Sequence, residues 1–386
     1  MEAYFTNNRF EKYSKTVLTL LVIIVVVVAD FVFTRVYHIQ KYGTIHKFAD
    51  RRALREPSPV FHHTLKPNGQ QQEQKWGHLS SPLYTNSLGF KDREIREIPF
   101  ASSNFRFLFI GDSFTEGIGI EYEKTFVGLI DAELARLNID VLNAAVSSYS
   151  PTIYFKKIEY LLETVGLDFD HLIVFLDISD IEDEVRRYDT HNGRVIGLMS
   201  RTSKVKEFVY EYTGLLKNLW TLAINMQKTI APTHEDLRSE EERRYGVNQQ
   251  RSLWTVNEET FHDYGQHGLD KARKRMDLLY QLLQRHRKEM TLAVYPWSDQ
   301  IMHKDLHSRH VTFWEEWAKE HSVPFVNFFP LFISPNGDPK EVLRTYFIEG
   351  DVHWNEQGHE LMTRELFTKI QGAFPKLLHR QEVDSD

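Results

Sequence analysis

From Asn104 onward, short apolar runs alternate with stretches of helical periodicity. Such runs are typical of buried strands, and apolar residues at steps of three and four are typical of helices. Their alternation is typical of a parallel sheet with helices on both faces. The predicted strands cover residues 105–110, 139–143, 172–176, 291–295 and 324–328, and the predicted helices cover residues 124–137, 152–164, 268–288, 308–320 and the segment after Asn355. The pattern therefore predicts one doubly wound α/β domain of five strands over residues 104–375.

A longer apolar run near the N-terminus covers residues 16–33. As a helix it extends roughly 27 Å, close to the thickness of a bilayer core. Basic residues precede this run, and by the positive-inside rule they place residues 1–15 in the cytoplasm. Other basic residues follow the run, and these weaken the prediction of its orientation. Asp30 is tolerable in such a span only near its outer interface. The small residues ending at Ala29 also fit a signal-peptide cleavage site, but the run continues beyond them, so we predict an uncleaved anchor with the rest of the chain exported.

Two segments do not follow the strand–helix alternation. Residues 34–103 are predicted to form an extended juxtamembrane connector, with a short strand or hairpin over 83–90. Residues 184–265 are predicted to be a helical insertion. Within it, apolar residues recur at helical spacing from Val205 to Met226, and we expect this amphipathic helix to pack on the domain. A lid, or a surface for a partner or a membrane, is the alternative. Residues 376–386 are a C-terminal tail.

Composition narrows the function classes. The chain has 386 residues, of which 41% are hydrophobic and 26% charged, as in an ordinary globular protein. The net charge of −7 provides no global basic field for nucleic acid. The absence of cysteine excludes disulfides, thiol catalysis and cysteine zinc sites.

The first predicted strand ends in Gly111-Asp112-Ser113, and a helix-compatible segment follows. Open α/β sheets bind ligands at the carboxyl ends of their strands. Backbone N–H groups at the start of the next helix also point toward an oxyanion forming there. Ser113 is thus either a nucleophile or a helix cap.

A serine becomes nucleophilic when a base takes its proton and a third group orients that base. Asp351 and His353 lie two residues apart, just before the last predicted helix. On a loop at the carboxyl edge of the sheet, they would converge on Ser113. His353 would then be the general base and acid, and Asp351 would hold its tautomer.

These residues resemble the SGNH (GDSL-type) hydrolase superfamily over residues 104–372. Residues 111–117 are similar to the block that carries the nucleophile, here Ser113. Residues 141–149 are similar to a second block that usually carries an oxyanion-hole glycine, and here Ser148 occupies the position of that glycine. The third block normally carries Asn-Asp, and here the pair is Ser179-Asp180. The last block matches at Asp351 and His353, with two residues of spacing where three are common.

The resemblance implies an SGNH (flavodoxin-like) three-layer fold and a serine esterase or O-acyltransferase that needs no cofactor. It implies an oxyanion hole formed by Ser113, Ser148 and Ser179. The Asp-x-His-Trp form resembles the branch that acetylates bacterial exopolysaccharides such as alginate. That branch implies a single-pass inner-membrane protein with a periplasmic catalytic domain, O-acetylated polysaccharide as substrate and a polysaccharide-synthesis complex as partner. The predicted substrate contacts are Asp112, Tyr149, Asp180, Trp297 and Trp354, and core packing is the alternative for both tryptophans.

Two alternatives to this function stay open. Because Ser179 shortens the expected Asn donor, the chain is either a slower enzyme or a non-catalytic carbohydrate-binding or scaffold subunit. A lipase or thioesterase would need a long apolar channel.

Other side chains are weaker candidates for a site. The histidines at 303, 307 and 310 share a predicted helical face but lack a carboxylate at ligand spacing, so we predict no metal there. The acidic residues at 177, 180, 182 and 183 are expected to cap a helix and form salt bridges rather than bind a cation. The glycine-rich segment 111–119 lacks the residues of a phosphate-binding loop.

Overall fold

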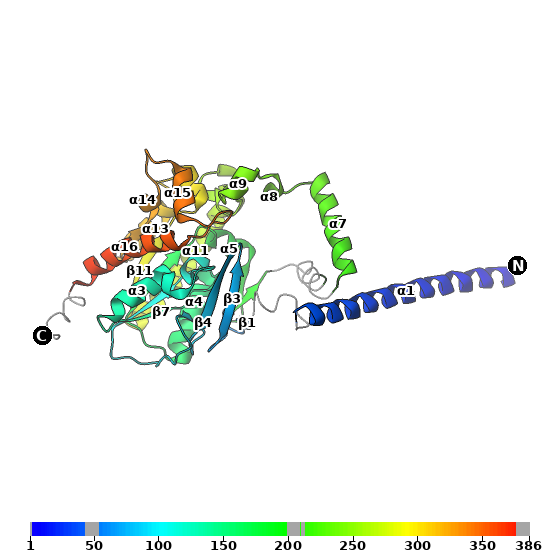
Figure 1. The fold of residues 1–386 in the computed structure, drawn as a ribbon, viewed down its shortest axis with the longest axis horizontal. Coiled ribbons are helices and arrows are strands. Elements are labelled where there is room, and N and C mark those ends of the chain that lie inside the picture. Colours follow the sequence, from blue (N-terminus) through cyan, green and yellow to red (C-terminus); the bar gives the residue numbers. More distant parts are fainter. Residues whose placement is uncertain (1, 43–53, 199–208, 210–212, 376–386) are drawn as a thin grey trace. The chain divides into compact units, whose positions relative to one another are not determined.

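The computed structural model describes residues 2–42, 54–198, 209 and 213–375 (Figure 1). The chain divides into two compact units. The smaller unit combines residues 1–52 with residues 199–236, and the larger one combines residues 53–198 with residues 237–386.

The larger unit contains a five-stranded, fully parallel sheet with the strand order β12-β11-β8-β6-β7. The strands are β6 (Arg106–Ile110), β7 (Asp140–Asn143), β8 (His171–Leu176), β11 (Glu289–Val294) and β12 (Phe325–Asn327). Each coincides, within two residues at either end, with a predicted strand. All residues of β6 and β8 are buried, as expected for central strands covered on both faces. The predicted α/β fold is confirmed.

Helices form a layer on each face of this sheet. Crossovers between parallel strands are right-handed, so the direction of a connection decides the face on which its helix lies. α3 (Phe126–Ala135) leads from β6 outward to β7, whereas α4 (Pro151–Tyr160) leads from β7 back past β6 to β8. α11 (Gln266–Arg285) packs against α4, and α16 (Glu356–Ala373) packs against α3. Because the connections reverse direction at β6, the carboxyl ends of β6 and β8 form the switch point at which such sheets bind ligands.

Residues 54–92 form short antiparallel strands where the sequence pattern predicts a connector. β1 (Arg55–Ser58) pairs with β2 (His62–Leu65), and β3 (Gln70–Trp76) pairs with β4 (Leu79–Thr85), which also pairs with β5 (Lys91–Asp92). The hairpin expected over 83–90 corresponds to β4 and β5. Hydrophobic periodicity does not reveal β3, because only one of its seven residues is buried.

The remaining short elements connect these parts. They are α2 (Ser113–Glu116), η1 (Tyr122–Lys124), η2 (Leu161–Val165), α5 (Asp180–Arg186), β9 (Tyr188–His191), β10 (Arg194–Gly197), α8 (His234–Leu237), α9 (Glu240–Arg244), η3 (Leu253–Thr255), α10 (Glu258–Thr260), η4 (Phe261–Gly265), α12 (Ser298–Met302), α13 (Arg309–Glu320), α14 (Phe329–Phe332) and α15 (Pro339–Tyr346).

The smaller unit contains α1 (Glu2–Tyr42), α7 (Leu215–Ile230) and the first three residues of α8. Residues 13–40 of α1 are long and apolar enough to cross a membrane, as a membrane anchor or a signal sequence would be. α7 is the described part of the amphipathic helix that the sequence predicts. None of its residues is buried.

Candidate active site

Ser113 lies at the tight turn between β6 and α2. The turn needs glycine at 111, because a Cβ there would lie 2.3 Å from the hydroxyl oxygen of Thr115. Asp112 caps α2, since its Oδ1 accepts a hydrogen bond from the N–H of Phe114 at 3.0 Å. The capping role is therefore filled by Asp112, and the Ser113 hydroxyl is available for another partner.

The three residues of the predicted triad are hydrogen-bonded in sequence. His353 Nε2 lies 2.7 Å from Ser113 Oγ, and His353 Nδ1 lies 2.5 Å from Asp351 Oδ1. Asp351 and His353 are in the loop that precedes α16, whose N-cap Asn355 accepts a hydrogen bond from the N–H of Gly358. The fold thus brings together residues 240 positions apart in the chain.

Trp76, on β3, is a member of this network that sequence reasoning missed. Its indole N–H donates to Asp351 Oδ2 at 2.7 Å, and its ring meets that of His353 edge-on at 5.4 Å between centroids. Because Oδ1 of Asp351 is bonded to His353, each of the two carboxylate oxygens has its own ring nitrogen as a partner. The only signal in the sequence is a tryptophan within a polar, weakly periodic segment.

The charges of the pair favour an ionised aspartate beside a basic imidazole. Burial alone would raise the pKa of Asp351, but hydrogen bonds from His353, its charge, its backbone N–H and the Trp76 indole lower it to about 2. Burial alone would lower the pKa of His353, but the hydrogen bond and charge of Asp351, together with the charges of Asp112 and Asp177, raise it above its ordinary value. His353 therefore accepts the proton of Ser113 more readily than an isolated imidazole does.

A second cluster of buried carboxyl groups lies beside Ser113. Asp112 Oδ2 lies 2.9 Å from Ser113 Oγ. The Tyr295 hydroxyl bridges Asp177 Oδ2 (2.9 Å) and Asp112 Oδ1 (3.2 Å). Burial, followed by the charge of Asp177, raises the pKa of Asp112. The Ser113 hydroxyl lies within hydrogen-bond distance of both Asp112 Oδ2 and His353 Nε2, and its single proton can be donated to either.

The predicted oxyanion donors differ in whether their hydrogen atoms are already bonded to an acceptor. Among the hydrogen bonds of the described residues, none has the backbone N–H of Ser113 or Ser148 as its donor. Ser148 has a φ of 66°, the left-handed conformation that glycine adopts without strain. The Tyr188 hydroxyl donates to the Ser148 carbonyl at 2.7 Å, and Arg187 Nη1 donates to its hydroxyl at 3.1 Å. The Ser179 hydroxyl donates to Asp177 Oδ1 at 2.5 Å, so in this structure its proton is directed at a carboxylate.

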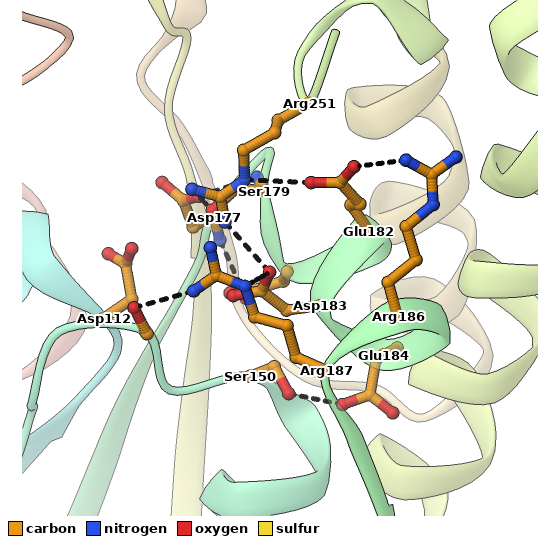
Figure 2. A network of polar contacts seen from close by, with 12 residues as sticks. Asp112, Ser150, Asp177, Ser179, Glu182, Asp183, Glu184, Arg186, Arg187 and Arg251 are labelled. Carbon is orange, nitrogen blue, oxygen red and sulfur yellow. Dashed lines mark hydrogen bonds and ion pairs between the residues drawn. The ribbon is translucent and has the colours of Figure 1, made fainter. Parts of the chain in front are cut away.

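Two of the acidic residues after β8, Glu182 and Asp183, are paired with arginines (Figure 2). Arg251 lies 3.0 Å from Glu182 and 2.9 Å from Asp183. Arg186 also pairs with Glu182, and Arg187 also pairs with Asp183. The expected salt bridges are present at Glu182 and Asp183, whereas Asp177 and Asp180 accept hydrogen bonds from the hydroxyl groups of Ser179 and Tyr154. Within the described ranges, no group of three or more histidine, aspartate or glutamate side chains is placed to hold a metal ion.

The histidine trio does not share a helix. α12 ends at Met302 and α13 begins at Arg309, so the expected common face is wrong. The His310 ring is buried, with Nε2 3.2 Å from the Leu176 carbonyl oxygen.

A cavity of about 380 Å³ opens over Ser113 and His353. Its lining is mostly polar and consists of Trp76, Asp112, Ser113, Ser147, Ser148, Ser179, Arg238, Gln249, Arg251, Trp297, Gly350, Asp351, Val352 and His353.

Two of the five predicted substrate contacts, Asp112 and Trp297, line this cavity. The other three, Tyr149, Asp180 and Trp354, are buried and are not among its lining residues. Trp354 packs edge-on against the rings of Phe114 and Tyr295, which is the core-packing alternative.

No family model and no curated protein sequence matches the chain. Its structure is similar to a psychrotrophic esterase from Pseudoalteromonas sp., with 12% identity, a TM-score of 0.39, and coverage of 70% of this chain and 100% of the other. It is also similar to an acetylxylan esterase from Geobacillus stearothermophilus, with 14% identity, a TM-score of 0.38, and coverage of 70% of this chain and 96% of the other. A third similar structure is a putative lipolytic protein of the G-D-S-L family from Desulfitobacterium hafniense. Its identity is 11%, its TM-score is 0.36, and the match covers 68% of this chain and 98% of the other. At these identities and TM-scores, the likenesses assign no activity.

Proposed function

We propose that this chain is a serine esterase or O-acyltransferase of the SGNH (GDSL-type) superfamily. The observation that carries the proposal is the hydrogen-bonded series from Ser113 through His353 to Asp351, at 2.7 and 2.5 Å. A serine, a histidine and an aspartate in this order are the arrangement that acyl-transfer enzymes on unrelated folds share.

The reaction proceeds in two half-reactions. Ser113 Oγ attacks the ester carbonyl carbon while its proton passes to His353 Nε2, and the imidazolium is stabilised by Asp351. The tetrahedral intermediate collapses as His353 returns that proton to the leaving alcohol, which leaves an acyl-serine. A water molecule, or a hydroxyl of an acceptor, then attacks the acyl carbon with His353 as base, and Ser113 is regenerated.

The backbone N–H groups of Ser113 and Ser148 stabilise the oxyanion in this mechanism. Ser113 and Ser148 both line the cavity. Because the hydroxyl proton of Ser179 is directed at Asp177, that side chain contributes less than the Asn amide that the resemblance leads one to expect. One donor fewer typically costs about 10²–10³ in rate, so the proposed enzyme is slow.

The substrate that we propose is an O-acetyl ester of a cell-surface or secreted polysaccharide. Serine, arginine and glutamine side chains line the cavity and suit a hydroxyl-bearing substrate better than a long acyl chain. In this proposal α1 is an uncleaved anchor in a bacterial inner membrane, the catalytic unit is periplasmic, and a polysaccharide-synthesis complex is the partner.

The test measures hydrolysis of p-nitrophenyl acetate and butyrate by the full chain in detergent. Wild type is compared with Ser113→Ala and His353→Ala, and the matched controls are the exposed residues Ser334→Ala and His307→Ala. We expect turnover only in wild type and controls, with acetate preferred to butyrate. Addition of an O-acceptor saccharide distinguishes transfer from hydrolysis.

A fluorophosphonate probe tests the nucleophile separately. Ser113 should be labelled in wild type and in Ser334→Ala. A folded protein that neither turns over ester nor labels at Ser113 would support the non-catalytic carbohydrate-binding or scaffold alternative. A preference for butyrate and longer esters would support a lipase or thioesterase.

A further inference from the structure

The start of α7 is bonded to α1 through a single carboxylate. Asp30 Oδ1 accepts hydrogen bonds from the N–H groups of Gly214 (3.0 Å) and Leu215 (2.8 Å), and Oδ2 accepts one from Leu216 (3.0 Å). The first N–H groups of a helix have no partner within it and carry the positive end of its dipole. The end of a helix therefore stabilises the charge of Asp30.

The two helices also approach closely at this point. A Cβ on residue 214 would lie 3.1 Å from the hydroxyl oxygen of Thr34 and 3.5 Å from Asp30 Oδ1. Glycine at 214 thus lets the first turn of α7 reach the side of α1.

The hydrogen bonds of Asp30 set the level along α1 at which α7 begins. Asp30 lies within the stretch of α1 that is long and apolar enough to span a bilayer. It is three residues, roughly 4.5 Å, from Phe33, at which the apolar run ends. If the apolar run of residues 16–33 spans the bilayer, α7 begins near the membrane–water boundary.

α7 carries an exposed apolar stripe along its whole length. Its members recur at steps of three and four, and each is at least 51% exposed: Leu215, Leu219, Leu222, Met226 and Ile230. Asn218 and Asn225 lie on the adjacent face. The stripe extends roughly 24 Å.

We propose that α7 is an interfacial helix, which lies in the plane of the membrane with this stripe in the lipid and its start fastened to the anchor by Asp30. Lipid is the occupant that these observations select, because the stripe begins beside Asp30, three residues before the end of the apolar run 16–33. A helix with one apolar and one polar face lies in the interface instead of crossing it. This proposal does not depend on the proposed esterase activity.

The absence of native cysteine allows the full chain to be labelled at single sites. Met226→Cys, Asn225→Cys and Gln227→Cys each carry a nitrobenzoxadiazole label in vesicles of phosphatidylethanolamine and phosphatidylglycerol. Quenching is measured with a lipid nitroxide near the headgroup. Consecutive residues face about 100° apart, so quenching should be at least about threefold stronger at 226 than at either neighbour.

Two further variants test whether α1 spans the bilayer and whether Asp30 positions α7. Val25→Cys should be quenched by a nitroxide deep in the bilayer, and failure would overturn the proposal because α1 would not span. Asp30→Ala should reduce the quenching at 226 to that of its neighbours.

Equal quenching at 225, 226 and 227 would overturn the proposal. So would a label at 226 that is shielded from water but not quenched by lipid, because a protein surface would then cover the stripe. Hydrolysis of p-nitrophenyl acetate by the same samples reports on the active site independently of either result.

Discussion

Trp76→Phe removes one hydrogen bond from the triad and keeps an aromatic ring against His353. The lost bond joins the indole N–H to Asp351 Oδ2 at 2.7 Å. A hydrogen bond to a charged group contributes roughly 1.5–3 kcal/mol. The Asp351 side chain is 23% exposed, so water replaces part of the lost contact and the lower end of that range applies.

The loss of this hydrogen bond should lower kcat more than it changes KM. About 1.5 kcal/mol corresponds to about tenfold in rate. Asp351 orients the imidazole that moves the proton, whereas the phenyl ring still lines the cavity, so we expect kcat for p-nitrophenyl acetate to fall about tenfold with KM changed less than about twofold.

Trp317→Phe is the matched control. Its indole N–H also donates to a carboxylate at 2.7 Å, but that carboxylate belongs to Asp277, which does not line the active-site cavity. This control should lower the melting temperature and leave kcat unchanged. A kcat within twofold of wild type in folded Trp76→Phe, or an equal loss in both variants, would refute the positioning role.

Three other predictions concern the same site. Ser148→Gly should keep kcat/KM within about threefold because the backbone donor remains and φ is relaxed, whereas Ser148→Val, with a β-branched side chain at φ of 66°, should lose about 1–3 kcal/mol of stability in chemical denaturation. Ser179→Ala should cost less than about threefold in kcat, because its hydroxyl donates to Asp177; a loss of about 10²–10³ would instead identify Ser179 as an oxyanion donor. Since the base must be neutral and the pKa of His353 is raised, kcat/KM should fall as the pH decreases through a midpoint above 6.5, and a midpoint below 6.5 would contradict the coupling to Asp351.

The central sheet could be predicted because its strands are short apolar runs buried on both faces. Ser113, Asp351 and His353 could be predicted as a group, since a serine that ends a strand and a histidine before a helix both lie at the carboxyl edge of a parallel sheet. Their hydrogen bonds agree with that prediction, and their catalytic roles stay a prediction.

Trp76 could not be predicted, because β3 is mostly exposed and its place depends on pairing with β4 and on contacts far away in sequence. The φ of Ser148 is likewise set by tertiary contacts, through the hydrogen bonds from Tyr188 and Arg187. The direction of the Ser179 hydroxyl depends on Asp177, a neighbour whose orientation is fixed by Tyr295 and Trp297.

The pairing of Arg55 with Glu116 has a consequence for the smallest piece of this chain that can fold. Glu116 is fully buried, and Arg55 contacts both of its carboxylate oxygens, at 2.7 and 2.9 Å. Lys91, also buried, donates to the carbonyl oxygens of Gly117 and Ile120. A fragment that begins at residue 104, where the sheet pattern starts, would retain Glu116 and lose Arg55, and an unpaired buried charge costs about 3–5 kcal/mol. We therefore expect that the smallest fragment that folds stably includes Arg55 and the strands that precede the central sheet.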